Sequence, residues 1–502
     1  MTAGRAPESV QLLIGAGVVF AGQLVGRALS FFYHLLLGRV LGPVGYGAFL
    51  LGLALFTFAS LLADLGLRWW VLRESATAEG RGDLGRVRGT FVGGSLVGLG
   101  GSLLAGVGLL ALTPSAAAWF KASDLAWLLP VFALALPFTT LATLSVSTLQ
   151  ALRRPAALSV IQYLLDPLLR IAVFAGLGLL GWHLVAAAAS HLLAAVTTAL
   201  VGIIWLSFAF PLFSRASLEF RFGALMAFSL PLFVSNLVGF ALQWADTLLL
   251  GYYLSTAEVG LYGAVGRLAG LGAMFLTAVG AVFAPKIYAL DGQGDLAEVG
   301  RLYQRSTRWV LILSVPLFLY TVTNAESLLA LFGQGFVEAA PALLILSVAT
   351  LVMTGTGSAG DLVLMAGRSD AVLYSSLAVG ALGLALNASL IPLFGLFGAA
   401  VATGLTIASS NLANVWMAWR FTGLQPYTRA IVKPILVALV VAALQLVLAP
   451  LVGEKPVPRL VAAGGIWLLY PFLLRRMGLE AEDLEAWSLI SRSKLCAGSP
   501  AS

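Results

Sequence analysis

Three arginines interrupt the long apolar stretches of this sequence, and their chemistry suits the binding of anions. Arg27, Arg170 and Arg267 stand deep within such stretches, and Asp166 precedes Arg170 by four residues, across Pro167. An ionised side chain near the middle of a bilayer costs roughly 2.5–3.5 kcal/mol on insertion scales, so such groups usually face a wet cavity or a partner. A guanidinium also binds phosphate oxygens at two points. We therefore expect these four residues to line a substrate cavity. A structural arginine at Arg27 and a structural ion pair between Asp166 and Arg170 remain alternatives.

Other charged side chains are candidates for a gate or for coupling to H+ or Na+. Asp246 and Arg267 flank an outer turn at depths that differ by only ~3 Å, which predicts contact across the hairpin, as a structural clasp or as a cavity-facing gate. Asp64 and Arg68 are also four apart, but their place near the end of an apolar run favours a structural pair. Asp361 follows a glycine-rich segment, where it either lines a cytoplasmic entrance or lies at a solvated helix end.

The composition predicts an all-α polytopic membrane protein. Sixty per cent of the residues are hydrophobic, 10% are charged and the mean hydropathy is +0.97, whereas soluble domains carry about 25% charged residues. Apolar runs of about 20 residues can cross a hydrocarbon core. The first run is longer than a signal-peptide core, so we expect it to be a retained helix. The predicted spans are 10–37, 48–71, 89–113, 126–150, 156–179, 183–208, 223–252, 259–285, 307–325, 340–366, 371–392, 396–419, 429–450 and 459–475.

The distribution of basic residues predicts the orientation in the membrane. Most of the 29 Lys and Arg residues fall in alternate loops and at the adjoining span ends, and such loops are normally cytoplasmic. We therefore expect a plasma membrane protein of the bacterial type, with both termini on the cytoplasmic side. The net charge of +7 then needs no nucleic-acid partner to explain it.

An internal repeat organises the chain. The stretch 24–41 aligns without a gap to 237–254, with ten identical residues at an offset of 213, and the Gly80-x-Gly82-Asp83-Leu84 motif returns at 292–296. A looser match relates Gly181 to Gly395. A period of six spans predicts two parallel six-helix repeats around a central cavity. The expected domains are an N-terminal lobe at 1–210, a C-terminal lobe at 211–423, two extra helices at 424–476 and a cytoplasmic tail at 477–502.

Three stretches carry a resemblance to a known family. They are ADTLLLGYYLSTAEVGLYGAVGRLAG (245–270), GRVLGPVGYGAF (38–49) and LIPLFGLFGAAVATG (390–404). Together they resemble the polysaccharide transporter branch of the multidrug/oligosaccharidyl-lipid/polysaccharide exporter superfamily. The resemblance implies a flippase that moves a lipid-linked oligosaccharide to the outer leaflet by alternating access, in the making of O-antigen, capsule or exopolysaccharide. The sequence lacks the arginine-rich first span expected of the lipid II branch, which disfavours a peptidoglycan precursor as cargo.

The implied partners are the lipid-linked oligosaccharide and membrane lipid, with a polysaccharide polymerase or glycosyltransferases as further candidates. A cation-coupled multidrug antiporter would share the fold, but it would favour an acid-dominated cavity, for which Asp246 and Asp166 are the candidates. An enzyme acting on the same lipids would need a sizeable outer loop, and none is predicted, so we do not expect an enzyme. No P-loop is present, so energy would come from an ion gradient, the membrane potential or substrate turnover.

Neither a metal site nor a cofactor is expected. Cys496 is the single cysteine, and His34, His183 and His191 are scattered near predicted helix ends. Metal-ligand spacing is therefore absent, and interfacial packing is the predicted role of the histidines.

Overall fold

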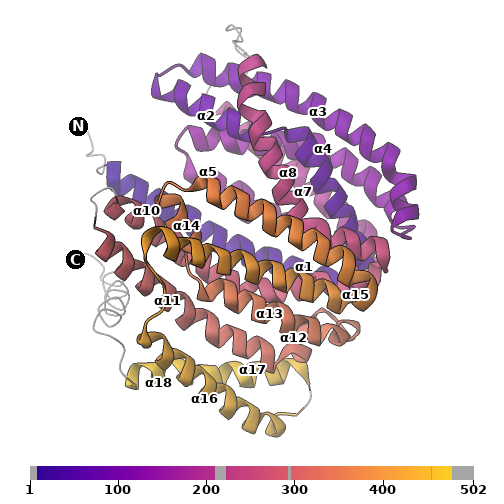
Figure 1. Cartoon of the computed structure of the whole chain (residues 1–502). Helices are drawn as coiled ribbons and strands as arrows, with labels where there is room; N and C mark the ends of the chain where they lie inside the picture. The colour runs from indigo at the N-terminus through magenta and orange to yellow at the C-terminus, as the bar shows by residue number, and fades with distance from the viewer. Residues whose placement is uncertain (1–7, 210–221, 292–294, 454, 478–502) are drawn as a thin grey trace, which may run out of the picture. The chain divides into compact units, whose positions relative to one another are not determined.

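The computed structural model describes residues 8–209, 222–291, 295–453 and 455–477, and within these ranges the chain is helical without a strand (Figure 1). The all-α prediction is confirmed. Residues 210–221 and 478–502, the latter nearly all of the expected cytoplasmic tail, lie outside the described residues. The principal helices are α1 (Glu8–Asp64), α2 (Leu67–Gly80), α3 (Leu84–Trp119), α4 (Leu125–Ala151), α5 (Pro155–Leu158), η1 (Ser159–Leu165), α6 (Asp166–Gly178), α7 (His183–Ser207), α8 (Phe222–Tyr253), α9 (Thr256–Ala269), α10 (Ala273–Asp291), α11 (Leu296–Thr323), α12 (Ala325–Phe332), η3 (Gln334–Ala339), α13 (Ala340–Gly355), α14 (Ala359–Met365), α15 (Ser369–Thr422), α16 (Val432–Leu448), α17 (Pro456–Trp467) and α18 (Leu469–Arg476).

Two of these helices each contain two membrane spans. In the described part of the chain, 12 helices are long and apolar enough to cross a membrane. Backbone breaks at Gly42 in α1 and Gly395 in α15 divide the two longest of them. The chain reverses at Gly42, because the Tyr46 hydroxyl returns to within 3.2 Å of His34 Nδ1. Counting each of these two helices twice agrees with the fourteen spans expected from the sequence.

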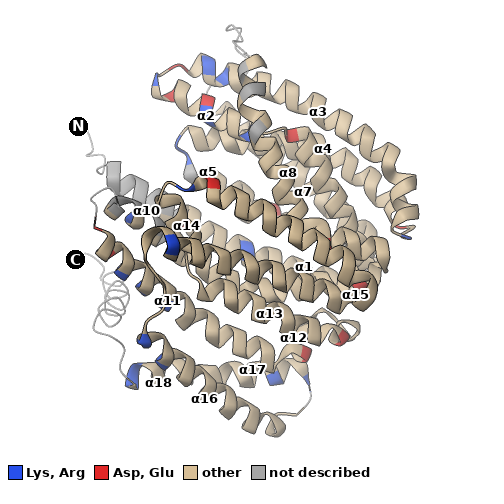
Figure 2. Ribbon diagram, in the orientation of Figure 1, with Lys and Arg blue, Asp and Glu red and all other residues tan. Residues whose placement is uncertain are grey.

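The helix surfaces match a lipid environment. Figure 2 shows Lys, Arg, Asp and Glu mostly near helix ends, with long stretches of other residues between them. Side chains such as Leu103, Leu104 and Val107 on α3 are large, apolar and exposed, as expected of a helix face in contact with lipid. The chain is therefore a multi-pass membrane protein.

The chain divides into two compact units. The first comprises 1–267 with 332–342 and 378–403, and the second comprises 268–331, 343–377 and 404–502. In the first unit, α4 packs against α3 and α7, and α6 packs against α7. In the second, α10 and α16 pack against α11. The lobe boundaries expected from the sequence remain a prediction.

The sequence repeat marks positions that have the same local structure. Asp83 and Asp295 each cap a helix, accepting from the backbone N–H of the residue three positions on, at 2.9 Å to Arg86 and 3.0 Å to Glu298. Such caps satisfy a donor that the first helical turn leaves free. Gly181 and Gly395 both adopt positive φ, at 83° and 59°, which only glycine adopts without a steric penalty. Both repeated matches therefore lie where a helix begins, ends or breaks.

Two glycines related by the same offset allow a close contact within the first unit. A Cβ on Gly47 would lie 1.7 Å from the Thr256 carbonyl oxygen, and a Cβ on Gly260 would lie 2.0 Å from the Pro43 carbonyl oxygen. Both pairs, 43 with 256 and 47 with 260, differ by 213 residues, so the contact is reciprocal. Small residues let helix backbones approach closely in this way.

Candidate functional site

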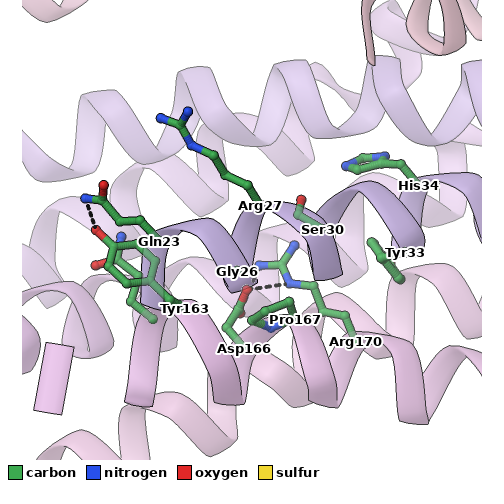
Figure 3. Close-up of a pocket in the computed structure, with 11 residues that line it drawn as sticks. Gln23, Gly26, Arg27, Ser30, Tyr33, His34, Tyr163, Asp166, Pro167 and Arg170 are labelled. Carbon is green, nitrogen blue, oxygen red and sulfur yellow. Dashed lines mark hydrogen bonds and ion pairs between the residues drawn. The ribbon is translucent and has the colours of Figure 1, made fainter. Parts of the chain in front are cut away.

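A polar cavity of about 390 Å³ lies in the first unit, between α1, η1 and α6 (Figure 3). Its lining contains two of the predicted substrate-binding arginines, Arg27 and Arg170, together with Asp166. Neutral polar groups complete it, namely Gln23, Ser30, Tyr33, His34, Gln162 and Tyr163. A cavity with this lining can hold a charged, hydrogen-bonding group away from lipid.

Local backbone features bring these side chains together. A Cβ on Gly26 would lie 2.7 Å from the Tyr163 carbonyl oxygen, so the glycine lets α1 lie directly against η1. The η1 segment is a π-helix, and the Asp166 N–H donates to the carbonyl of Ile161, five residues earlier. Such wide turns recur at functional sites. The irregularity expected from Pro167, which has no N–H to donate, is therefore found in the turn just before it.

Arg27 lines the cavity and has no acidic partner among the residues that the structure describes. Its side chain is exposed in the structure, and none of the ion pairs among the described residues includes it. In Figure 3 its guanidinium extends away from the Asp166–Arg170 pair. Its full positive charge is thus available to a ligand.

Arg170 has two partners on two helices. Its Nε lies 2.9 Å from Asp166 Oδ2 and its Nη2 donates to Asp166 Oδ1 at 3.1 Å. Its Nη1 lies 2.9 Å from Nδ1 of His191 on α7. The predicted Asp166–Arg170 contact is therefore an ion pair that also borders the cavity, and its contact with substrate stays a prediction. The prediction of interfacial packing was wrong for His191, which is 3% exposed.

Arg267 lies beside the cavity without lining it. It interacts with the Tyr46 hydroxyl, and its charge also acts on His34, a residue of the cavity wall. Arg170 acts on His34 too. Two of the predicted arginines thus line the cavity, and the third does not.

Asp246 makes contacts that the sequence did not predict. Its Oδ2 lies 2.7 Å from the Tyr262 hydroxyl and 3.4 Å from Thr403 Oγ1, and these two hydroxyls are 2.8 Å apart. Its Oδ1 accepts from the Thr247 N–H at 2.6 Å. No ion pair of the described residues joins Asp246 to Arg267, so the expected clasp is not formed here. Similar depth along two helices does not fix the rotation of each helix about its axis.

The Asp246 contact has a counterpart in the first repeat. Tyr33 and Ser190, each 213 residues before Asp246 and Thr403, are joined by a 2.7 Å hydrogen bond. Ser190 donates its own proton to the Ala187 carbonyl, so Tyr33 is the donor to Ser190. The duplicated fold therefore keeps a polar contact at this place, and only the second copy puts a carboxylate in it.

Asp64 and Arg68 do not form the predicted side-chain pair. Asp64 Oδ1 instead accepts from the Arg68 backbone N–H at 3.3 Å, beside Gly66 at φ 81°. The Arg68 guanidinium lies 5.1 Å from the Trp69 ring centroid and borders a second cavity of about 210 Å³. Asp64 thus satisfies a free donor in the first turn of α2.

That second cavity shares Gln162, Asp166 and Arg170 with the larger one. The Asp166–Arg170 ion pair therefore borders both cavities in the first unit.

Asp361 belongs to the second unit, in the first turn of α14. Within the described residues, no group of three or more His, Cys, Asp or Glu is arranged to hold a metal ion.

Two models of known protein families match this chain. The model of a family described as polysaccharide biosynthesis protein matches residues 12–290, and a second model, MatE, matches residues 231–378. Two similar proteins come from Haloferax volcanii. The chain is 30% identical over 192 residues to a probable flippase, AglR, and 24% identical over 182 residues to a probable low-salt glycan biosynthesis flippase, Agl15. Each match covers 36% of this chain and 39% of the relative.

The fold has solved counterparts. A structure of the lipid II flippase MurJ in an inward closed conformation aligns with a TM-score of 0.73, covering 91% of this chain and 99% of that one. The two sequences are 13% identical, so the likeness concerns the fold alone.

Proposed function

The chain belongs to the polysaccharide biosynthesis protein family, and on that premise we propose that it is a flippase for an anionic, polyprenyl-diphosphate-linked oligosaccharide. The substrate would pass from the cytoplasmic to the outer leaflet for the synthesis of a cell-surface polysaccharide such as O-antigen, capsule or exopolysaccharide. The relatives described as probable flippases support this class of activity, each over 39% of its own length. Glycosyltransferases and a polymerase acting on the same lipid would be its functional partners.

The observation that carries the proposal is Arg27, which forms no ion pair with the described residues, in a polar cavity that Arg170 also lines. A diphosphate loses hydration when it leaves water, and fixed cations must replace that hydration. Guanidinium groups do so at two points per group. The neutral polar side chains of the wall would hydrogen-bond the sugar nearest the diphosphate, while the polyprenyl tail stays in lipid.

The duplication supports a one-sided distribution of charge. The counterparts of Arg27 and Arg170 in the second repeat are Phe240 and approximately Leu384, which are apolar. We propose that the first repeat holds the anionic headgroup and that the cavity opens alternately to the two sides of the membrane. Arg267, whose counterpart at the same offset is Ala54, would add positive charge beside His34.

Substitution of Arg27 tests the proposal. We expect Arg27→Ala to abolish complementation of a flippase-deficient strain while the amount of protein in the membrane stays near normal. Arg27→Lys should restore part of the activity, since it keeps the charge but loses the two-point contact. Arg459→Ala, near the start of α17, is a matched control and should complement fully. Full complementation by Arg27→Ala, or a loss of protein in proportion to activity, would remove the main support.

A cation-coupled multidrug antiporter is the second candidate, favoured by the MatE match over residues 231–378 and by the oxygen cluster at Asp246. Under either function, Asp246 is our candidate for coupling to H+ or Na+. Expression in a strain that lacks its drug exporters separates the two functions. Increased drug resistance without complementation of the flippase defect would favour the antiporter.

A further inference from the structure

His191 and Arg170 stand 21 residues apart on neighbouring helices, yet their side chains meet at 2.9 Å. We propose that His191 is a positioning residue that fixes the Arg170 guanidinium for an anionic diphosphate headgroup. The proposal rests on the proposed function and adds to it a residue that does not line the cavity.

The hydrogen atoms that Arg170 and His191 carry determine which side chain donates and which accepts. A guanidinium carries five N–H donors and no acceptor, so His191 Nδ1 must be the acceptor and its ring must be neutral with the proton on Nε2. His191 engages one N–H of Nη1 and Asp166 one N–H of Nη2, while Nε lies 2.9 Å from Asp166 Oδ2 as an ion-pair contact without a hydrogen bond. One N–H remains on each terminal nitrogen for a ligand. Because His191 is uncharged, it orients the guanidinium without neutralising it.

Asp166 alone cannot provide this orientation. It stands four residues before Arg170 on the same helix face, so the pair can change rotamer together as a unit. His191 belongs to α7, which packs against α6, and it therefore ties Arg170 to a second helix. Three fixed contacts from two helices restrict the guanidinium to one plane.

The imidazole itself is held by aromatic rings. Its centroid lies 4.6 Å from that of Phe56 at 83° and 5.1 Å from that of Phe132 at 63°. Edge-to-face contacts of this kind stabilise one ring orientation. A buried ring in a fixed orientation presents Nδ1 at a fixed point, as a positioning residue requires.

The test compares two substitutions of His191, one that keeps a hydrogen-bond acceptor and one that keeps the aromatic ring. His191→Asn places an amide oxygen near the position of Nδ1, whereas His191→Phe keeps an aromatic ring in the cluster and removes the acceptor. His183→Phe, at the exposed start of the same helix, is the matched control. The full-length protein is purified in detergent, its melting temperature is recorded, and its affinity is measured for farnesyl diphosphate and for farnesol.

We expect wild type to prefer the diphosphate and His191→Phe to weaken that affinity roughly tenfold to a hundredfold, the effect of losing a hydrogen bond to a charged group. His191→Asn should recover most of the affinity, and farnesol binding should not change. In an Arg170→Gln background, His191→Phe should have no further effect, because a residue that acts only through Arg170 has nothing left to position.

Two outcomes would overturn the inference in different ways. An equal loss for His191→Phe with and without Arg170, or a loss for both probes, would make His191 a packing residue and leave the proposed function intact. No preference of wild type for the diphosphate over farnesol would contradict the proposed anion site, and with it any positioning role.

Discussion

Gly47 and Gly260 lie 213 residues apart in the chain, and each faces the backbone of the segment that precedes the other. The carbonyl oxygens that their absent side chains would strike belong to Thr256 and Pro43, which are related by the same offset. A duplicated sequence has thus produced a reciprocal contact in which two backbones touch.

This contact predicts the effect of adding a single methyl group. Gly47→Ala and Gly260→Ala should each lower the melting temperature of the purified protein, because overpacking of this kind typically costs about 1–3 kcal/mol. Gly100→Ala, where nothing lies within 4 Å of the added carbon, is the control and should melt at or above the wild-type temperature. Equal melting temperatures for all three variants would show that the contact opens at no cost.

The hydrogen bonds of Asp246 predict that a charge swap will fail. The carboxylate is held by Tyr262, Thr247 and Thr403, so exchanging Asp246 and Arg267 for each other should restore no activity beyond that of the single variants. Complementation by the double variant measures this. A clear recovery would show that the two side chains pair in another state of the transport cycle.

Asp246→Asn tests ion coupling at the same place. The amide keeps the shape and can still accept from Tyr262, but it can neither release a proton nor carry the charge that binds a cation. We expect normal protein levels and loss of transport in the complementation assay. Tyr262→Phe, which removes the hydroxyl that contacts Asp246 at 2.7 Å and Thr403 at 2.8 Å but keeps the carboxylate, should reduce activity less. Normal transport by Asp246→Asn would exclude coupling through this group.

Asp64 should act through the start of α2 and not through the Arg68 side chain. Asp64→Ala leaves the Arg68 N–H without its acceptor and should lower stability by about 1 kcal/mol, the usual effect of losing a helix cap. Asp64→Asn retains the acceptor and should melt close to wild type. If Arg68→Ala destabilises the protein as much as Asp64→Ala does, a side-chain pair exists after all.

If α16 crosses the membrane, the segments before and after it should lie on opposite sides. A reporter fused after Pro426 should be cytoplasmic, and one fused within 453–458 should be outside, because basic residues favour the cytoplasmic ends. Enzymatic activity of the two fusions provides the measurement. The same side for both would mean that α16 does not cross the membrane.

The sequence alone determined the class, the fourteen spans, the repeat and the scarce charges that line the cavity. Hydropathy and internal similarity are read along the chain, and a charge in an apolar run can be recognised whichever way the helix is rotated about its axis. These properties need no knowledge of which helices are neighbours. Arg27, Arg170 and Asp166 could therefore be selected as cavity residues before any contact was known.

Only the tertiary structure decided which of these groups meet. Tyr262 replaced Arg267 as the partner of Asp246, a backbone N–H replaced the Arg68 side chain beside Asp64, and His191 joined Arg170. Each of these outcomes depends on the rotation of a helix about its axis, or on a local break such as the one at Gly66. In a membrane span that is apolar all round, no polar stripe reveals that rotation. It is set instead by where small residues such as Gly26 allow two backbones to touch.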